Sequence, residues 1–202
     1  MMETQAHASD TLSPEERAAD STAVFGFWAY LMTDLVLFAS LFAVFAVLRG
    51  PAFGGSSMGN IFNLPYVLIE TIALLTSSFT CGLALLAARA DKVQAAILLL
   101  STTFVLGAAF VGMEVSEFTR LVAQGYGPSH SGFLSAYFTL VGTHGLHVAV
   151  GLLWLLSLTI AILKRGFSRG NMRKLALFSL FWHFLDIVWI FIFTIVYLMG
   201  AL

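Results

Sequence analysis

The segment Val24–Leu48, VFGFWAYLMTDLVLFASLFAVFAVL, contains a single charged side chain, Asp34. About 20 apolar residues in a helix, rising ~1.5 Å each, are enough to cross the hydrocarbon core of a bilayer. Four further segments have the same character, so the predicted spans are Val24–Leu48, Leu64–Ala88, Gln94–Phe118, Gly132–Leu163 and Leu175–Met199. The sequence therefore predicts an all-α, polytopic membrane bundle of five transmembrane helices.

The composition supports a membrane protein and excludes several other classes. Hydrophobic residues make up 59% of the chain and charged residues 10%, whereas a soluble domain carries about 25% charged residues. A net charge of −1 without an extended basic patch argues against nucleic acid as a partner. The one cysteine, Cys81, allows neither a disulfide framework nor a thiolate metal site.

The first residues differ from the remainder of the chain. Residues 1–22 are polar and rich in Ala, Ser, Asp and Glu, which predicts a disordered tail. They contain no basic run before a short apolar core, so they do not resemble a cleaved signal peptide. Residues 23–202 are predicted to form one five-helix transmembrane domain.

The distribution of Lys and Arg predicts the orientation. Cytoplasmic loops of membrane proteins carry an excess of these residues. Eight lie in the tail and in the loops after the second and fourth spans, and only Arg49 and Arg120 lie on the other side. The N-terminus is therefore predicted to be cytoplasmic and the C-terminus periplasmic. The eight are Arg17, Arg89, Lys92, Lys164, Arg165, Arg169, Arg173 and Lys174.

Polar side chains within or at the edge of the spans are the candidate functional residues. An acid near the bilayer centre costs about 2.5–3.5 kcal/mol on insertion scales, so such residues usually face a bundle interior, a partner or a pathway. Several are three residues apart and therefore share a helix face. The set comprises Asp34, Glu70, Glu114, Glu117, His144, His147, His183 and Asp186.

Three interpretations of this set are open. The histidines with a carboxylate could hold a metal or a haem, but their expected depths in the membrane differ. The acids could form a proton path, but they are scattered over both leaflets. The favoured hypothesis is a packing network of hydrogen bonds between helices. The aromatic side chains of Trp28, Tyr30, Tyr126 and Tyr197 are expected at the membrane interfaces.

Distinctive motifs occur in every predicted span. They are FGFWAYLMTD (25–34), ETIALLTSS (70–78), GMEVSEF (112–118), THGLH (143–147) and FWHFLD (181–186), the last leading to YLMG (197–200). In this order they resemble subunit III of the haem–copper terminal oxidases. The closest resemblance is to the subunits III of bacterial cytochrome bo-type ubiquinol oxidases, and it extends from Phe25 to the C-terminus.

The resemblance implies a non-catalytic subunit of a proton-pumping terminal oxidase in the bacterial cytoplasmic (inner) membrane. Such a complex oxidises ubiquinol and reduces O₂ to water, and subunit III supports assembly and stability of the catalytic subunit. The resemblance implies no catalytic, metal or cofactor residue in this chain, since haems and copper belong to subunit I. The implied partners are subunits I, II and IV and membrane phospholipids. The five spans match the last five of the seven-helix mitochondrial form.

The resemblance also implies that Glu70 pairs with a histidine of the THGLH motif. Counted from the outer side, Glu70 lies some six residues into its span and the histidines some twelve to fifteen into theirs, an offset that favours His144 over His147. Two alternative functions remain at this point. One is subunit III of a bacterial cytochrome c oxidase, and the other is a small, stand-alone proton channel or transporter.

Overall fold

Every regular element that the structure describes is a helix. The computed structural model describes residues 14–50 and 63–199. The helices are α2 (Pro14–Leu48), α3 (Leu64–Arg89), α4 (Val93–Ala123), α5 (Gly132–Arg165) and α6 (Arg169–Ile192), followed by the π-helical turn η3 (Phe193–Leu198).

Five helical segments among the described residues are long and apolar enough to cross a membrane. They correspond to the predicted spans. α2 begins at Pro14, ten residues before the predicted start at Val24, and the other ends differ from the prediction by six residues or fewer. The prediction of an all-α chain with five membrane-spanning helices is confirmed. The predicted orientation of the termini stays a prediction.

The chain forms two compact units, Met1–Leu37 and Phe38–Leu202, and the boundary between them falls within α2. Residues 1–13 lie outside the described residues, so the predicted disordered tail and the predicted boundary of the transmembrane domain stay predictions. The second unit contains the end of α2 and all of α3 to η3.

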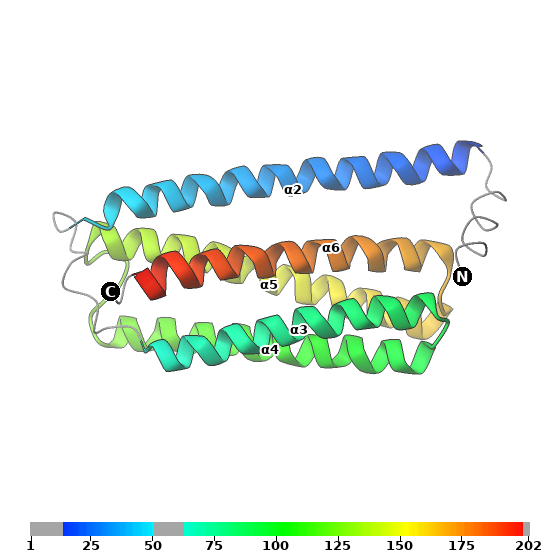
Figure 1. Cartoon of the computed structure of the whole chain (residues 1–202). Helices are drawn as coiled ribbons and strands as arrows, with labels where there is room; N and C mark the ends of the chain where they lie inside the picture. The colour runs from blue at the N-terminus through cyan, green and yellow to red at the C-terminus, as the bar shows by residue number, and fades with distance from the viewer. Residues whose placement is uncertain (1–13, 51–62, 200–202) are drawn as a thin grey trace. The chain divides into compact units, whose positions relative to one another are not determined.

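The helices α3, α4, α5 and α6 form a ring of neighbours within the second unit (Figure 1). α3 packs on α4 and α6, and α5 packs on the same two helices, so α3 and α5 occupy opposite corners. The three residues Ala90–Lys92 connect α3 to α4, and such a short connection requires the two helices to be antiparallel neighbours. η3 continues α6 and also packs on α3.

Two glycines allow the indole of Trp182, on α6, to enter the bundle. A Cβ atom on Gly107 of α4 would lie 2.9 Å from Trp182 Cζ2, and one on Gly151 of α5 would lie 2.9 Å from Trp182 Cζ3. Carbon atoms pack best about 3.5–4.0 Å apart, so any side chain at these positions would displace the ring. Trp182 is 1% exposed, and its Nε1 donates a hydrogen bond to Ser77 Oγ on α3 at 3.1 Å.

Local signals in the sequence explain where the helices begin and end. Ser131 and Ser168 precede α5 and α6, and their hydroxyl groups accept hydrogen bonds from Leu134 N and Asn171 N. These N-caps satisfy backbone donors that would otherwise lack partners. Gly166 follows the last residue of α5. Its φ of +66° would be strained for a residue with a side chain.

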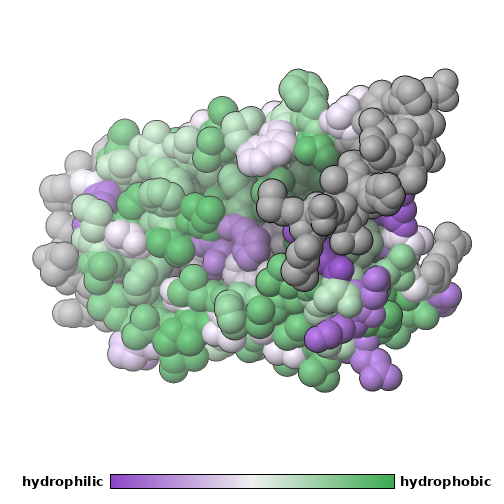
Figure 2. All heavy atoms as spheres, turned by 45° about the vertical axis from the view of Figure 1, so that its right-hand side comes forward, coloured by the Kyte–Doolittle hydropathy of each residue, from purple (hydrophilic) through white to green (hydrophobic). Residues whose placement is uncertain are grey.

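The surface of the chain is predominantly apolar, as expected of a protein that faces lipid. Figure 2 shows apolar side chains over much of the face drawn. Large hydrophobic residues are strongly exposed on the outside of the helices, among them Ile69, Phe79, Leu98, Val105 and Leu153. The most polar of the buried groups lie inside the helix ring, and they form the candidate site.

Candidate functional site

A cluster of acidic residues lies at the end of the bundle where α3 begins and α4 ends. Glu70 is one and a half turns into α3, and Glu117 is at a similar distance from the end of α4. Because α3 and α4 are antiparallel, these positions are at the same depth. Tyr137, near the start of α5, and Tyr197, in η3, reach the same level. The helix directions and lengths therefore bring these polar side chains together.

The carboxyl groups of the cluster are deeply buried. Glu70 is 0% exposed, Glu114 is 3% exposed and Glu117 is 2% exposed. They lie close enough to repel one another when charged. Glu114 contacts the backbone of α5 at Gly145, where a Cβ atom would be 2.5 Å from both carboxyl oxygens. Gly145 is therefore the residue that leaves room for this acid.

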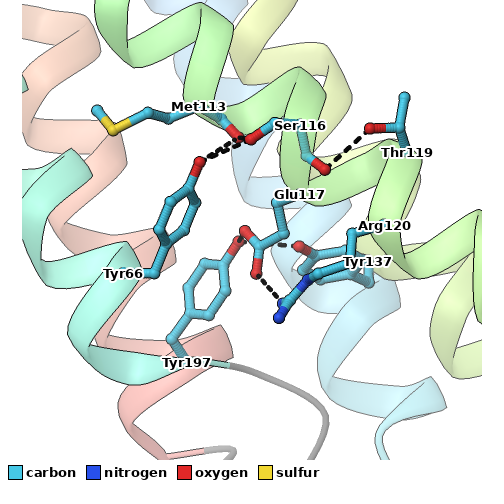
Figure 3. Close-up of polar contacts among 8 residues, drawn as sticks. All are labelled: Tyr66, Met113, Ser116, Glu117, Thr119, Arg120, Tyr137 and Tyr197. Atoms are coloured by element: carbon cyan, nitrogen blue, oxygen red, sulfur yellow. Dashed lines mark hydrogen bonds and ion pairs between the residues drawn. The ribbon is translucent and has the colours of Figure 1, made fainter.

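Glu117 is the member of the cluster with the most polar neighbours (Figure 3). The Tyr197 hydroxyl donates to Glu117 Oε2 at 3.3 Å, and the Tyr137 and Tyr197 hydroxyls are hydrogen-bonded at 2.9 Å. Both tyrosines are 0% exposed. Arg120 Nη2 lies 3.7 Å from Glu117 Oε1, a separation longer than a direct hydrogen bond.

A polar pocket of about 210 Å³ opens beside Glu117 and is lined by Asn63, Tyr66, Ser116, Glu117 and Arg120. We call it the Glu117 pocket. The Tyr66 hydroxyl is 2.6 Å from Ser116 Oγ and donates to the carbonyl of Met113 at 3.2 Å. These hydrogen bonds join the start of α3 to the end of α4 and form one wall of the pocket.

Several buried polar atoms of the cluster make no hydrogen bond within the described part of the chain. They include both carboxyl oxygens of Glu70, Oε2 of Glu114 and Oε1 of Glu117. An unsatisfied buried polar group costs about 1–3 kcal/mol, and more if it is charged. Native proteins usually satisfy such atoms with ordered water.

The predicted hydrogen bond between Glu70 and His144 is wrong. Neither ring nitrogen of His144 and neither oxygen of Glu70 has a hydrogen-bond partner among the described residues. The physical reason is that α3 and α5 lie at opposite corners of the ring. His144, which is 0% exposed, stacks on Trp189 with ring centroids 5.2 Å apart and meets the edge of Phe110 at 5.9 Å.

The other pairing that the family resemblance allowed, with His147, does not occur either. His147 Nδ1 lies 2.7 Å from the carbonyl oxygen of Thr143 in the same helix, and neither Glu70 oxygen has a hydrogen-bond partner among the residues described.

A second polar group lies further along the bundle, between α3 and α6. Ser78 Oγ is 2.5 Å from His183 Nδ1, and Asp186 lies near the same hydroxyl. Asp186 is 9% exposed and His183 is half-buried. Sequence analysis placed His183 and Asp186 on one helix face but did not identify Ser78 as their partner. Its position in the ETIALLTSS motif, two turns after Glu70, was the available signal.

Asp34 lies on α2, in the first compact unit. The hydroxyl of Tyr30, one turn earlier in α2, donates a hydrogen bond to its carboxylate. The side chain of Tyr197 is fully buried, so it does not face lipid as an interface residue would; its predicted depth in the membrane stays a prediction. The π-helical geometry of η3 differs from the α-helical spacing assumed for it, and π-helical turns are frequent at functional sites.

The structure places the candidate residues in separate locations. It brings together Glu70, Glu114 and Glu117, and separately His183 and Asp186, whereas His144 packs among aromatic rings. Among residues 14–50 and 63–199 no group of three or more His, Cys, Asp or Glu side chains is arranged to hold a metal ion. The hypothesis that the eight residues act as a packing network stays a prediction.

The fold and the site together define the class of protein, which is a helical membrane bundle with buried acids along α3, α4 and α6. Residues 11–201 match the family model described as cytochrome c oxidase subunit III. The chain therefore belongs to the cytochrome c oxidase subunit III family.

Curated relatives agree with this membership. The chain is 57% identical over 199 residues to cytochrome bo(3) ubiquinol oxidase subunit 3 of Pseudomonas aeruginosa, covering 98% of this chain and 95% of the relative. It is 45% identical to quinol oxidase subunit 3 of Bacillus subtilis, covering 88% and 87%. It is 40% identical to cytochrome bo(3) ubiquinol oxidase subunit 3 of Buchnera aphidicola, covering 94% and 93%.

Proposed function

We propose that this chain is the non-catalytic subunit III of a terminal ubiquinol oxidase in the bacterial cytoplasmic membrane. The observation that carries the proposal is the similarity to a ubiquinol oxidase subunit 3 at 57% identity over almost the whole of both chains. The complex would oxidise ubiquinol, reduce O₂ to water and move protons outward. This chain would support the assembly and stability of the subunit that carries the haems and copper.

The geometry supports a structural role better than a redox role. Some buried polar groups make hydrogen bonds between helices, such as those of Trp182 with Ser77 and of Trp189 with Thr71. The outer faces of the helices carry exposed large apolar side chains, which suit contact with phospholipid and with the apolar helices of subunits I, II and IV. The excess of Lys and Arg in the tail and in two of the loops supports a cytoplasmic N-terminus.

Deletion of this chain in its native host tests the proposal. We expect less assembled oxidase in the membrane and a faster loss of quinol-dependent O₂ uptake during sustained turnover. We also expect the haem absorbance of the purified complex to be unchanged per catalytic subunit, because the redox centres belong to that subunit. Complementation with the intact chain is the control. Normal assembly and normal long-term turnover in the deletion strain would contradict the proposed role.

The alternative donor, cytochrome c, is suggested by the description of the family model. The purified complex distinguishes the two donors directly. O₂ uptake with a ubiquinol analogue and none with reduced cytochrome c supports the proposal, whereas the reverse result replaces it with a cytochrome c oxidase. The buried acids also suggest a stand-alone proton channel, which predicts proton flux in liposomes that contain only this chain.

A further inference from the structure

The Glu117 pocket connects the surface of the chain to a buried carboxyl group. Asn63 and Ser116 on its wall are exposed, Tyr66 and Arg120 are partly exposed, and Glu117 is buried. The pocket lies beside the first turn of α3 and the last turns of α4. In a membrane-spanning bundle, this end of the helices is close to the polar headgroup region. The pocket is thus in a position to be reached by water.

The inner wall of the pocket carries two polar atoms without hydrogen bonds. Glu117 Oε1 and Arg120 Nη2 are 3.7 Å apart, both atoms are buried, and neither makes a hydrogen bond among the described residues. Their separation is longer than a direct hydrogen bond, so each atom has hydrogen-bonding capacity left for water in the pocket. The volume of about 210 Å³ exceeds the ~30 Å³ that one water occupies in the liquid, so several molecules fit.

Other polar groups lie on the inner side of Glu117. Tyr197 donates to its other oxygen, and the Tyr197 and Tyr137 hydroxyls are bonded to each other. The carboxyl groups of Glu70 and Glu114 lie near enough to interact electrostatically with Glu117. Any proton that binds to or leaves one of these carboxyl groups has to be exchanged with solvent.

We propose that the Glu117 pocket binds ordered water and is the opening through which the buried carboxyl groups of the bundle exchange protons with solvent. Water in the pocket supplies the hydrogen bonds that Glu117 Oε1 and Arg120 Nη2 lack among the described residues. A proton delivered by pocket water binds Glu117 Oε1, and Glu117 returns it to water by the reverse step. The titratable and charged groups that face Glu117 are Glu70 of α3, Glu114 and Arg120 of α4, Tyr137 of α5 and Tyr197 of η3.

Cysteine accessibility in the purified complex tests whether the pocket is hydrated. Ser116 lines the Glu117 pocket, whereas Thr119, one turn along α4 and also exposed, lines an apolar groove with Phe118 and Val122. In a Cys81→Ala background, a charged thiol reagent should modify Ser116→Cys and leave Thr119→Cys largely unmodified. Mass spectrometry of this chain separates its labelling from that of partner subunits. Equal labelling of the two variants, or none of Ser116→Cys, would overturn the proposal.

Hydrogen–deuterium exchange tests the passage of protons. An infrared band that is present in the unmodified complex and absent in Glu117→Gln or Glu70→Gln is assigned to the protonated carboxyl group of that residue. The shift of this band with time is then measured after transfer of the complex to D₂O. Ser116→Phe fills the pocket and should slow the exchange by about tenfold, equivalent to a barrier about 1.4 kcal/mol higher. Thr119→Phe adds the same bulk outside the pocket and should exchange at the unmodified rate. Unchanged exchange in Ser116→Phe would show that protons arrive by another route.

Discussion

Replacement of Gly107 by alanine should destabilise the bundle, because the new methyl group meets a ring that cannot retreat. Its Cβ would lie 2.9 Å from Trp182 Cζ2 and 2.9 Å from Leu152 Cδ2. Leu152 can change rotamer, but the indole is held on its other side by Gly151 and by its hydrogen bond to Ser77. The strain therefore falls on Trp182, whose indole reaches across the helix ring from α6 to α4.

The expected cost follows from two opposing contributions. Overpacking of a filled core costs about 1–3 kcal/mol, and the exchange of glycine for alanine within a helix returns about 1 kcal/mol. The net loss of stability is then up to about 2 kcal/mol. For a chain of this length it corresponds to a fall in Tm of up to about 8 °C.

The assay is thermal unfolding of this chain within the purified complex, followed by its tryptophan fluorescence. Gly112→Ala is the matched control, since Gly112 is also on α4 and a Cβ there meets nothing within 4 Å. It should be neutral or stabilising by up to about 1 kcal/mol. Trp182→Phe removes the atoms that clash, so Gly107→Ala should cost less in that background. The reasoning is refuted if Gly107→Ala unfolds at the same temperature as Gly112→Ala.

Three further substitutions probe the polar contacts. Trp189→Phe removes the donor to Thr71 Oγ1 at 3.0 Å and should cost about 1–3 kcal/mol in thermal stability, part of it from lost volume. Tyr197→Phe removes the hydroxyl bonded to Glu117 Oε2, so the free energy of unfolding should fall by about 1–2 kcal/mol. Glu70→Gln should change stability by less than about 1 kcal/mol, because neither oxygen of Glu70 has a hydrogen-bond partner to lose among the described residues.

Each of these predictions has an outcome that contradicts it. A Trp189→Phe variant as stable as the unmodified chain would mean that the bond to Thr71 contributes nothing; Trp154→Phe, a half-buried tryptophan of α5, is the control for the change of ring. A neutral Tyr197→Phe would show that the Glu117 carboxyl group is satisfied by other means. A large loss of stability in Glu70→Gln would mean that this carboxyl group has a specific partner.

Much of the architecture could be predicted from the sequence because the bilayer imposes a length and a polarity on each span. The predicted span Leu64–Ala88 differs from α3 by one residue, because an apolar run of bilayer length coincides with the helix. The end of the fifth span was less predictable. Hydropathy does not distinguish an α-helix from a π-helical turn, and so it did not reveal that Tyr197 turns inward.

The sequence predicts which acidic residues are buried in the site, but it does not predict which residues they contact. Burial of Glu70, Glu114, Glu117 and Asp186 follows from the cost of exposing acids to lipid. Their partners depend on which helices are neighbours, and depth alone does not decide this. Glu70 and His144 were matched by depth, yet their helices occupy opposite corners of the ring. Ser78 was overlooked as the partner of His183 because a serine gives no distinctive signal in an apolar segment.

The short connection between α3 and α4 has a consequence for the biogenesis of the protein. With only Ala90–Lys92 between them, the two helices can leave the translocon and partition into lipid together as a helical hairpin. Thr80 and Thr103 are hydrogen-bonded at 2.8 Å across this pair, as are Tyr66 and Ser116. These hydrogen bonds join the two helices before α5 and α6 have been synthesised.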